Sequence, residues 1–114
     1  LYPAHKQFLK SVENEASYQV KRLKDHPSIV LWCGNNEIAW AWHNWEWKEN
    51  LPEHLWGDYK LLFHKTLPDV CKKYDPKRLY WPTSPGHTTE APEEGQAYGD
   101  GDNHFWCLAW RRRF

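Results

Sequence analysis

The 114-residue sequence predicts a fold of the α/β class, in which helices alternate with parallel strands. Residues 5–24 have apolar side chains at helical spacing, and residues 28–33 form a short apolar run that is typical of a buried strand. Helical spacing returns over residues 55–74, and further strands are predicted at 79–81 and 104–110. This alternation is typical of βαβ units, although the last connection has no obvious crossover helix.

The first predicted helix, residues 5–24, is amphipathic, with a buried stripe that is surrounded by polar positions. Pro27 ends it, because the residue before a proline is disfavoured in the helical region. The strand at 28–33 follows at once and is expected to be covered on both faces, as in a parallel sheet. The stripe consists of Phe8, Val12, Ala16, Val20 and Leu23.

The segment after this strand is predicted to be a long loop, although residues 41–47 could form a short helix. It carries five aromatic or imidazole rings within residues 38–47 and shows no clean period, and Pro52 marks its far end. In the helix at 55–74, Pro68 predicts a kink or a break, with Thr66 capping a second short helix. Residues 75–78 form a turn, and residues 82–103 a second long loop. Loops of about 20 residues are usually functional or mobile.

Composition excludes several classes of function. The 15 basic and 15 acidic residues give a net charge of zero, so nothing indicates a nucleic-acid partner. No apolar run approaches the roughly 18 residues of a membrane span, and no signal-peptide core is present at the amino terminus. The three cysteines and seven histidines are scattered, so the sequence predicts no metal site and no cofactor. The absence of methionine is expected for a segment of a longer protein.

Aromatic residues are the informative excess, since nine Trp, six Tyr and four Phe make up 17% of the chain. Many of the rings lie in polar segments beside His and Asn. Clefts that bind sugars are often built in this way, because the apolar face of a pyranose stacks on a flat ring while its hydroxyls need polar partners.

Residues 25–37 read Asp-His-Pro-Ser-Ile-x-x-Trp-x-Gly-Asn-Asn-Glu. This pattern resembles the fourth-strand signature of the glycoside hydrolase family 2 catalytic barrel, in the form carried by its β-mannosidases. Residues 62–76, 80–85 and 101–106 are similar to the same branch in the same order. The resemblance implies that residues 1–114 are part of a catalytic (β/α)8 TIM barrel, from about the third helix through the sixth strand. The remainder of the parent chain would complete the barrel.

By the same resemblance the function is that of a retaining exo-β-mannosidase, which hydrolyses terminal non-reducing β-D-mannose residues from a β-mannoside substrate. Glu37 would be the general acid/base and Asn36 would contact the sugar 2-hydroxyl. The nucleophile, a second Glu, would lie beyond Phe114. A strand-end glutamate is by itself more often a solvated carboxylate, so it is the motif that favours catalysis. A general acid must also hold its proton near neutral pH, which burial favours.

Five aromatic or imidazole residues are candidate substrate contacts, each weighed against a packing role. The first ring faces either the barrel interior or the helices, depending on register. Two rings in the loop after Glu37 either form the wall of the leaving-group subsite or pack the loop. The last two share one strand face, which the resemblance puts near the terminal sugar. These residues are, in that order, Trp32, Trp42, Trp45, His104 and Trp106.

Two alternatives stay open. Another family 2 glycosidase, such as a β-galactosidase or a β-glucuronidase, would share the barrel and the acid/base. The doubled asparagine at residues 35–36 and the Trp-Pro-x-Ser-Pro run at 81–85 favour the β-mannosidase. A non-catalytic carbohydrate-binding protein could also keep an aromatic cleft, but would not need the second carboxylate.

Overall fold

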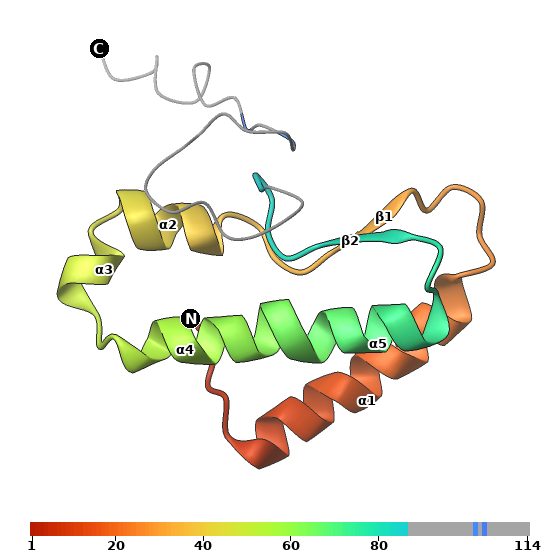
Figure 1. Cartoon of the computed structure of the whole chain (residues 1–114), viewed down its shortest axis with the longest axis horizontal. Helices are drawn as coiled ribbons and strands as arrows, with labels where there is room; N and C mark the ends of the chain where they lie inside the picture. The colour runs from red at the N-terminus through yellow and green to blue at the C-terminus, as the bar shows by residue number, and fades with distance from the viewer. Residues whose placement is uncertain (87–101, 103, 105–114) are drawn as a thin grey trace, which may run out of the picture.

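The structure is a computed structural model that describes residues 1–86, 102 and 104. Helices α4, η1 and α5 follow one another as a single rod, which lies between α1 on one side and the two strands on the other (Figure 1). The elements are α1 (Lys6–Leu23), β1 (Leu31–Cys33), α2 (Ile38–Asn44), α3 (Trp47–Asn50), α4 (His54–Lys60), the π-helical η1 (Leu61–Thr66), α5 (Leu67–Tyr74) and β2 (Leu79–Trp81).

Strands β1 and β2 pair in parallel, with Trp32 opposite Tyr80 at the centre of the register. One isolated parallel bridge, between Asn36 and Ser84, extends the pairing beyond the strand ends. The parallel arrangement and the helical connection confirm the α/β prediction in a coarse form, since the described part is rich in helix and has short strands. The predicted strand at 104–110 lies outside the described residues, apart from His104.

The first helix is confirmed almost residue for residue. The Nδ1 atom of His5 accepts a hydrogen bond from the Phe8 amide at 3.2 Å, which caps the amino terminus. Further along, Val20 packs with Val70 and Cys71 of α5, and Trp32 of β1 covers this cluster. Phe8 and Val12 pack against a second cluster on the rod, so burial of the stripe along the rod is what holds α1 to the rest of the fold.

A second apolar cluster joins α2 to the rod and contains Ala39, Tyr59, Leu62 and Phe63. Aromatic stacking extends it. The Trp56 ring lies between those of Tyr59 at 4.5 Å and Trp42 at 5.3 Å, in nearly parallel planes. This cluster lies beneath the ends of the strands and therefore supports the loops that follow them.

The prediction of a long loop after β1 is wrong, because α2 and α3 occupy most of residues 38–50. The side-chain oxygen of Asn35 accepts a hydrogen bond from the Ile38 amide at 3.1 Å and so satisfies a free donor at the start of α2. Ala39, Ala41 and Trp42 are then at most 3% exposed. Ala39 and Trp42 are three positions apart, as on one face of a helix, but the buried Ala41 interrupts this spacing, so no clean helical pattern is visible in the sequence.

Of the predicted kink or break at Pro68, the break does not occur, and the π-helical η1 is the distortion that precedes the proline. A short helix, α5, does begin after Thr66, but the Thr66 side chain does not cap it. The helix continues through six residues of π-helix, and Pro68 lies in the first turn of α5. Proline removes an amide donor and crowds the carbonyl of the preceding turn, and a wider turn relieves both. The Thr66 hydroxyl donates to the Leu61 carbonyl at 2.9 Å instead of capping a helix.

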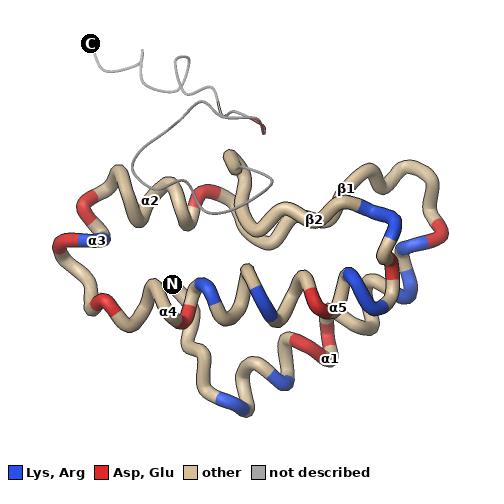
Figure 2. Tube along the Cα trace, viewed as in Figure 1, with Lys and Arg blue, Asp and Glu red and all other residues tan. Residues whose placement is uncertain are grey.

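Charges of both signs are distributed along the helices and the turns, whereas neither strand carries a charged residue (Figure 2). None of the helices in the described part of the chain is both long enough and apolar enough to cross a membrane.

Candidate active site

Beyond their carboxyl ends the two strands continue side by side, β1 into residues 34–37, which include Glu37, and β2 into residues 82–84. The Gly34 amide donates to the Trp81 carbonyl at 2.8 Å, and the Ser84 amide donates to the Asn35 carbonyl at 2.9 Å. The Glu37 amide then donates to the Ser84 carbonyl at 2.7 Å. Residues 34–37 are therefore held by the same parallel hydrogen-bond pattern as the strands, which gives the site a rigid base.

Gly34 is required by the close approach of its neighbours. A Cβ atom at this position would lie 2.4 Å from the Pro82 carbonyl oxygen, 2.6 Å from the Tyr80 hydroxyl and 2.9 Å from a ring carbon of Phe63. The Tyr80 hydroxyl is itself fixed, since it donates to the Phe63 carbonyl at 2.8 Å. Backbone and bonded side chain therefore leave no room for a methyl group.

We expect Gly34→Ala to lower the free energy of unfolding by about 1–3 kcal/mol or more, because the methyl group overpacks a rigid site. Chemical denaturation of the purified variant measures this loss. Gly57→Ala is the matched control, since a Cβ there would meet nothing within 4 Å and its helical position favours alanine. Equal stability of the two variants would show that the strand ends can separate.

Asn35 ties the start of α2 to the end of β2. Its side-chain amide donates to the Pro82 carbonyl at 2.7 Å. Its side-chain oxygen accepts from the Ile38 amide at 3.1 Å and from the Thr83 hydroxyl at 2.8 Å. Thr83 is 2% exposed, so this hydroxyl needs an internal partner. One side chain thus fixes both segments that border Glu37.

Glu37 is buried and has an unusual backbone conformation. It is 7% exposed, and its φ of 61° lies in the left-handed region, which residues other than glycine rarely adopt. Hydrogen bonds on both sides hold it there, because its carbonyl also accepts from the Ala41 amide at 2.7 Å. Such strain persists where the surroundings determine the conformation, and it is concentrated at functional sites.

The Glu37 side chain is the inner end of a chain of hydrogen bonds. Its Oε1 atom lies 2.6 Å from His104 Nδ1, and the Nε2 atom of the same ring lies 2.8 Å from the Ser84 hydroxyl. Ser84 donates in turn to the Asp102 carboxylate. The Gly86 amide donates to the other oxygen of Asp102 at 3.2 Å. Four polar side chains from three segments therefore converge at the strand ends.

The other titratable groups near the strand ends are held in their neutral forms. Burial raises the pKa of the Cys33 thiol, with a weaker opposing effect of its hydrogen bond to the Asn35 carbonyl. Burial also raises the pKa of the Tyr59 and Tyr80 hydroxyls. Burial and the Asp75 carboxylate raise the pKa of Cys71 to about 11, so this thiol is unreactive at neutral pH.

Of the predicted site residues, the structure brings Glu37 and His104 into contact. Asn36 lies next to Glu37 and is exposed. Trp106 lies outside the described residues.

The predicted rings have different surroundings. Trp32 is partly buried against the cluster of Val20, Val70 and Cys71, and its indole N–H donates to Asp75 at 2.9 Å. Trp42 is 3% exposed and stacks on Trp56, an arrangement that leaves little ring surface for a sugar. Trp45 is 49% exposed and meets Trp47 edge to face.

Ser84 is a site residue that the sequence analysis missed, since it appeared there only within the Trp-Pro-x-Ser-Pro run at the start of the second long loop. A signal was present. The carboxyl ends of parallel strands meet at one edge of a sheet, so polar residues that follow 79–81 should lie beside those that follow 28–33. Asn35 and Thr83 could have been found by the same argument.

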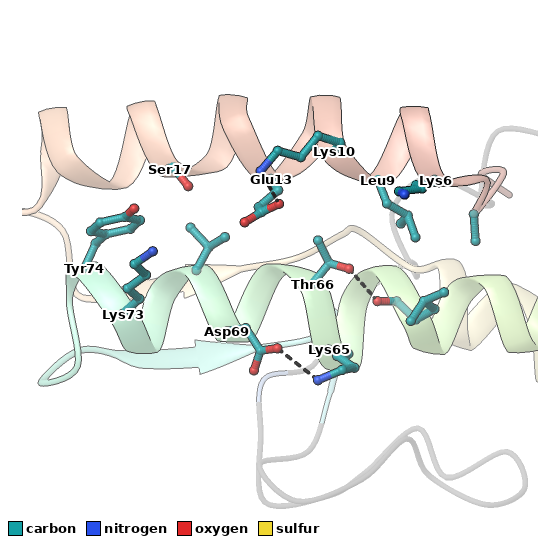
Figure 3. Close-up of a pocket in the computed structure, with 13 residues that line it drawn as sticks. Lys6, Leu9, Lys10, Glu13, Ser17, Lys65, Thr66, Asp69, Lys73 and Tyr74 are labelled. Carbon is teal, nitrogen blue, oxygen red and sulfur yellow. Dashed lines mark hydrogen bonds and ion pairs between the residues drawn. The ribbon is translucent and has the colours of Figure 1, made fainter.

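The groove in Figure 3 is separate from this site. It lies between α1 and the η1–α5 part of the rod, has a volume of about 580 Å³ and does not include Glu37. Its charges are mixed, with Lys10 paired to Glu13 at 2.9 Å and Lys65 to Asp69 at 3.1 Å. In the part of the chain that the structure describes, no group of three His, Cys, Asp or Glu side chains could hold a metal ion.

Known proteins with similar sequences are glycoside hydrolases, and more particularly β-mannosidases. The chain is 35% identical to the β-mannosidase of Rattus norvegicus over 97% of its length, and 38% identical to β-mannosidase B of Aspergillus fumigatus over 92%. The crystal structure of the β-D-mannosidase from Dictyoglomus thermophilum matches 96% of the chain with a TM-score of 0.73 and 40% identity. No protein-family model matches. The chain is thus β-mannosidase-like over almost its whole length.

The match covers a limited part of those proteins. The chain spans 14% of the rat protein, 13% of the fungal protein and 13% of the bacterial chain of known structure. The resemblance predicted from the motifs is confirmed for this segment.

Proposed function

We propose that this chain is part of the catalytic (β/α)8 barrel of a retaining, family 2 exo-β-mannosidase, and that Glu37 is its general acid/base. One observation carries the proposal. Glu37 is a buried carboxyl group at the carboxyl end of a parallel strand, in contact with His104, in a chain 35–40% identical to β-mannosidases. In (β/α)8 enzymes, catalytic residues lie at this end of the strands.

Exposed apolar residues directly before β1 and at the start of β2 support the barrel. Val30 is 80% exposed and Leu79 is 49% exposed. In a closed barrel these side chains would be covered by neighbouring strands or by the layers of residues that fill its interior. The remainder of the parent protein would supply those strands.

The proposed reaction has two steps that both use Glu37. A nucleophilic carboxylate from the remainder of the protein attacks the anomeric carbon while Glu37 protonates the departing oxygen. Glu37 then removes a proton from water, which attacks the glycosyl-enzyme from the same face and gives retention of configuration. Asn36, exposed beside Glu37, would donate a hydrogen bond to the sugar 2-hydroxyl.

Aromatic contacts with the substrate are proposed for fewer rings than the sequence suggested. Trp45 has an exposed face and remains a candidate for the leaving-group side, and Trp106 remains a candidate for the terminal sugar. Trp32 and Trp42 are assigned to packing, because their ring surfaces are occupied by neighbours in the fold.

Activity of the full-length protein on a panel of 4-nitrophenyl glycosides tests the function. We expect kcat/KM for the β-mannoside to exceed that for the β-galactoside and the β-glucuronide by at least about 100-fold, because a site that hydrogen-bonds one hydroxyl configuration rejects the others. Proton NMR of the first product should show β-mannose before mutarotation. A preference for the β-galactoside or β-glucuronide would identify another family 2 glycosidase, and binding without hydrolysis would identify a carbohydrate-binding protein.

A further inference from the structure

The hydrogen bonds around His104 can be assigned by counting protons. A serine hydroxyl has one proton, and the Ser84 hydroxyl uses it in the hydrogen bond that it donates to Asp102 Oδ2. The Ser84 oxygen can therefore only accept from His104 Nε2, 2.8 Å away. The Nε2 atom of His104 must then carry a proton.

This assignment decides what happens at the other ring nitrogen. His104 Nδ1 and Glu37 Oε1 are 2.6 Å apart, so a single proton must lie between them for a hydrogen bond to form. Either neutral His104 accepts the proton of a protonated Glu37, or a doubly protonated His104 donates to the Glu37 carboxylate. In both forms the pair holds one proton.

We propose that His104 is a positioning residue that shares the acid proton with Glu37, and that Ser84 and Asp102 maintain this arrangement by keeping a proton on Nε2. The proposal rests on the proposed function of Glu37. If Nε2 were free to lose its proton, a neutral imidazole could donate from Nδ1 to a Glu37 carboxylate and the pair would hold no acid proton. While Nε2 keeps its proton for the bond to Ser84, loss of the shared proton leaves a lone pair on His104 Nδ1 facing a lone pair on Glu37 Oε1. The repulsion between them opposes that loss.

The proton balance of the two chemical steps follows. In the first step the shared proton leaves with the departing alcohol, so the pair has lost one proton. In the second step Glu37 takes one proton from the attacking water, and the pair returns to its starting state. In this proposal His104 helps Glu37 to keep the regained proton until the next substrate binds. It does so without contacting the sugar, whereas the sequence suggested a sugar contact for His104.

The charged groups around the pair support this arrangement. Asp102 Oδ2, which accepts from the Ser84 hydroxyl, also lies 3.7 Å from His104 Nε2. Cys33 at the end of β1 and the hydroxyls of Tyr59 and Tyr80 are neutral, since burial raises the pKa of each. On α2, His43 lies edge-on to Trp56 with ring centroids 5.2 Å apart.

The pH profile of kcat/KM for a substrate with a poor leaving group tests the proposal in the full-length protein. We expect His104→Gln to move the basic limb towards lower pH by about one unit or more, because a glutamine amide favours the Glu37 carboxylate and removes the shared-proton state. Ser84→Ala should move the basic limb in the same direction by less. Without the Ser84 hydroxyl, the His104 imidazole can change tautomer and carry its proton on Nδ1. His54→Gln, at an exposed position in α4, should leave the profile unchanged.

A uniform loss of activity at all pH values in His104→Gln would overturn the proposal, because it would indicate a packing role. That result would leave the proposed function standing, whereas an inactive wild-type protein would remove it. Nitrogen-15 NMR of histidine-labelled wild-type protein gives a second readout that needs neither activity nor a folded variant. We expect His104 Nε2 to be protonated throughout the pH range of the active form. A neutral imidazole with its proton on Nδ1 would contradict the assignment.

Discussion

Replacement of Glu37 by glutamine in the full-length protein is expected to lower kcat/KM by about 10²–10⁴-fold for β-mannosides with poor leaving groups, because glutamine cannot protonate the departing oxygen. For an activated aryl mannoside such as the 2,4-dinitrophenyl compound, kcat/KM should fall by less than about tenfold, since that leaving group needs no proton. Steady-state kinetics on both substrates measures the difference.

The second chemical step, hydrolysis of the glycosyl-enzyme, gives an independent test of Glu37 as the acid/base. Without a general base, the glycosyl-enzyme is hydrolysed slowly, so the activated substrate should show a burst of dinitrophenolate followed by slow turnover. Glu46→Gln is the matched control, because Glu46 is also a glutamate in the left-handed conformation, with φ of 59°, but is exposed. Equal losses on both substrates in the Glu37 variant would argue against the acid role.

Replacement of Asn35 by alanine is expected to cost about 3 kcal/mol of folding stability and to lower activity as well. The change removes three hydrogen bonds and leaves the Ile38 amide, the Pro82 carbonyl and the Thr83 hydroxyl without their shared partner. Because Asn35 also positions the backbone of Glu37, displacement by about 1 Å would reduce kcat/KM by roughly 100-fold. Thermal inactivation and steady-state kinetics of the variant measure the two effects.

Two further variants test whether the losses in Asn35→Ala come from its three side-chain hydrogen bonds. Asn44→Ala removes one exposed hydrogen bond, from its side-chain amide to the Trp40 carbonyl at 2.9 Å, and should change stability by less than about 0.5 kcal/mol. Asn35→Asp keeps the acceptor for Ile38 and Thr83 but loses the donor to Pro82, so its effect should be intermediate. If Asn35→Ala were as stable as Asn44→Ala, the strand ends would be held by the backbone bonds alone.

Much of the local structure could be predicted from the sequence. The stripe that begins at Phe8 determines an amphipathic helix, because only helical spacing gathers these residues on one face. The apolar runs that contain Trp32 and Tyr80 predict strands. The helix between them indicates that the strands are parallel, since antiparallel neighbours can be joined by a short turn, and the structure has them parallel. Glu37 was singled out because residues 25–37 resemble the fourth-strand signature of the family 2 β-mannosidases, and that motif lies within one stretch of chain.

Other elements were decided by packing that no local pattern contains. Helix α2 forms because Trp42 stacks on Trp56 and Asn35 caps Ile38, and the stacking joins residues 14 positions apart (56 − 42). The ring of Trp32 was expected at the sugar or in the core. In the fold the ring packs against the cluster of Val20, Val70 and Cys71, and its indole N–H donates a hydrogen bond to Asp75, 43 residues later.

The sequence by itself determined the class of fold, the parallel strands and the position of Glu37, because each depends on residues that are close together in the chain. Only the tertiary structure brought Ser84, Asp102 and His104 to that carboxyl group, across as many as 67 residues. Hydrogen-bond partners of this kind depend on which strand ends meet at the edge of the sheet. Periodicity specifies which face of an element is buried, but it carries no information about the polar groups that face each other across two loops.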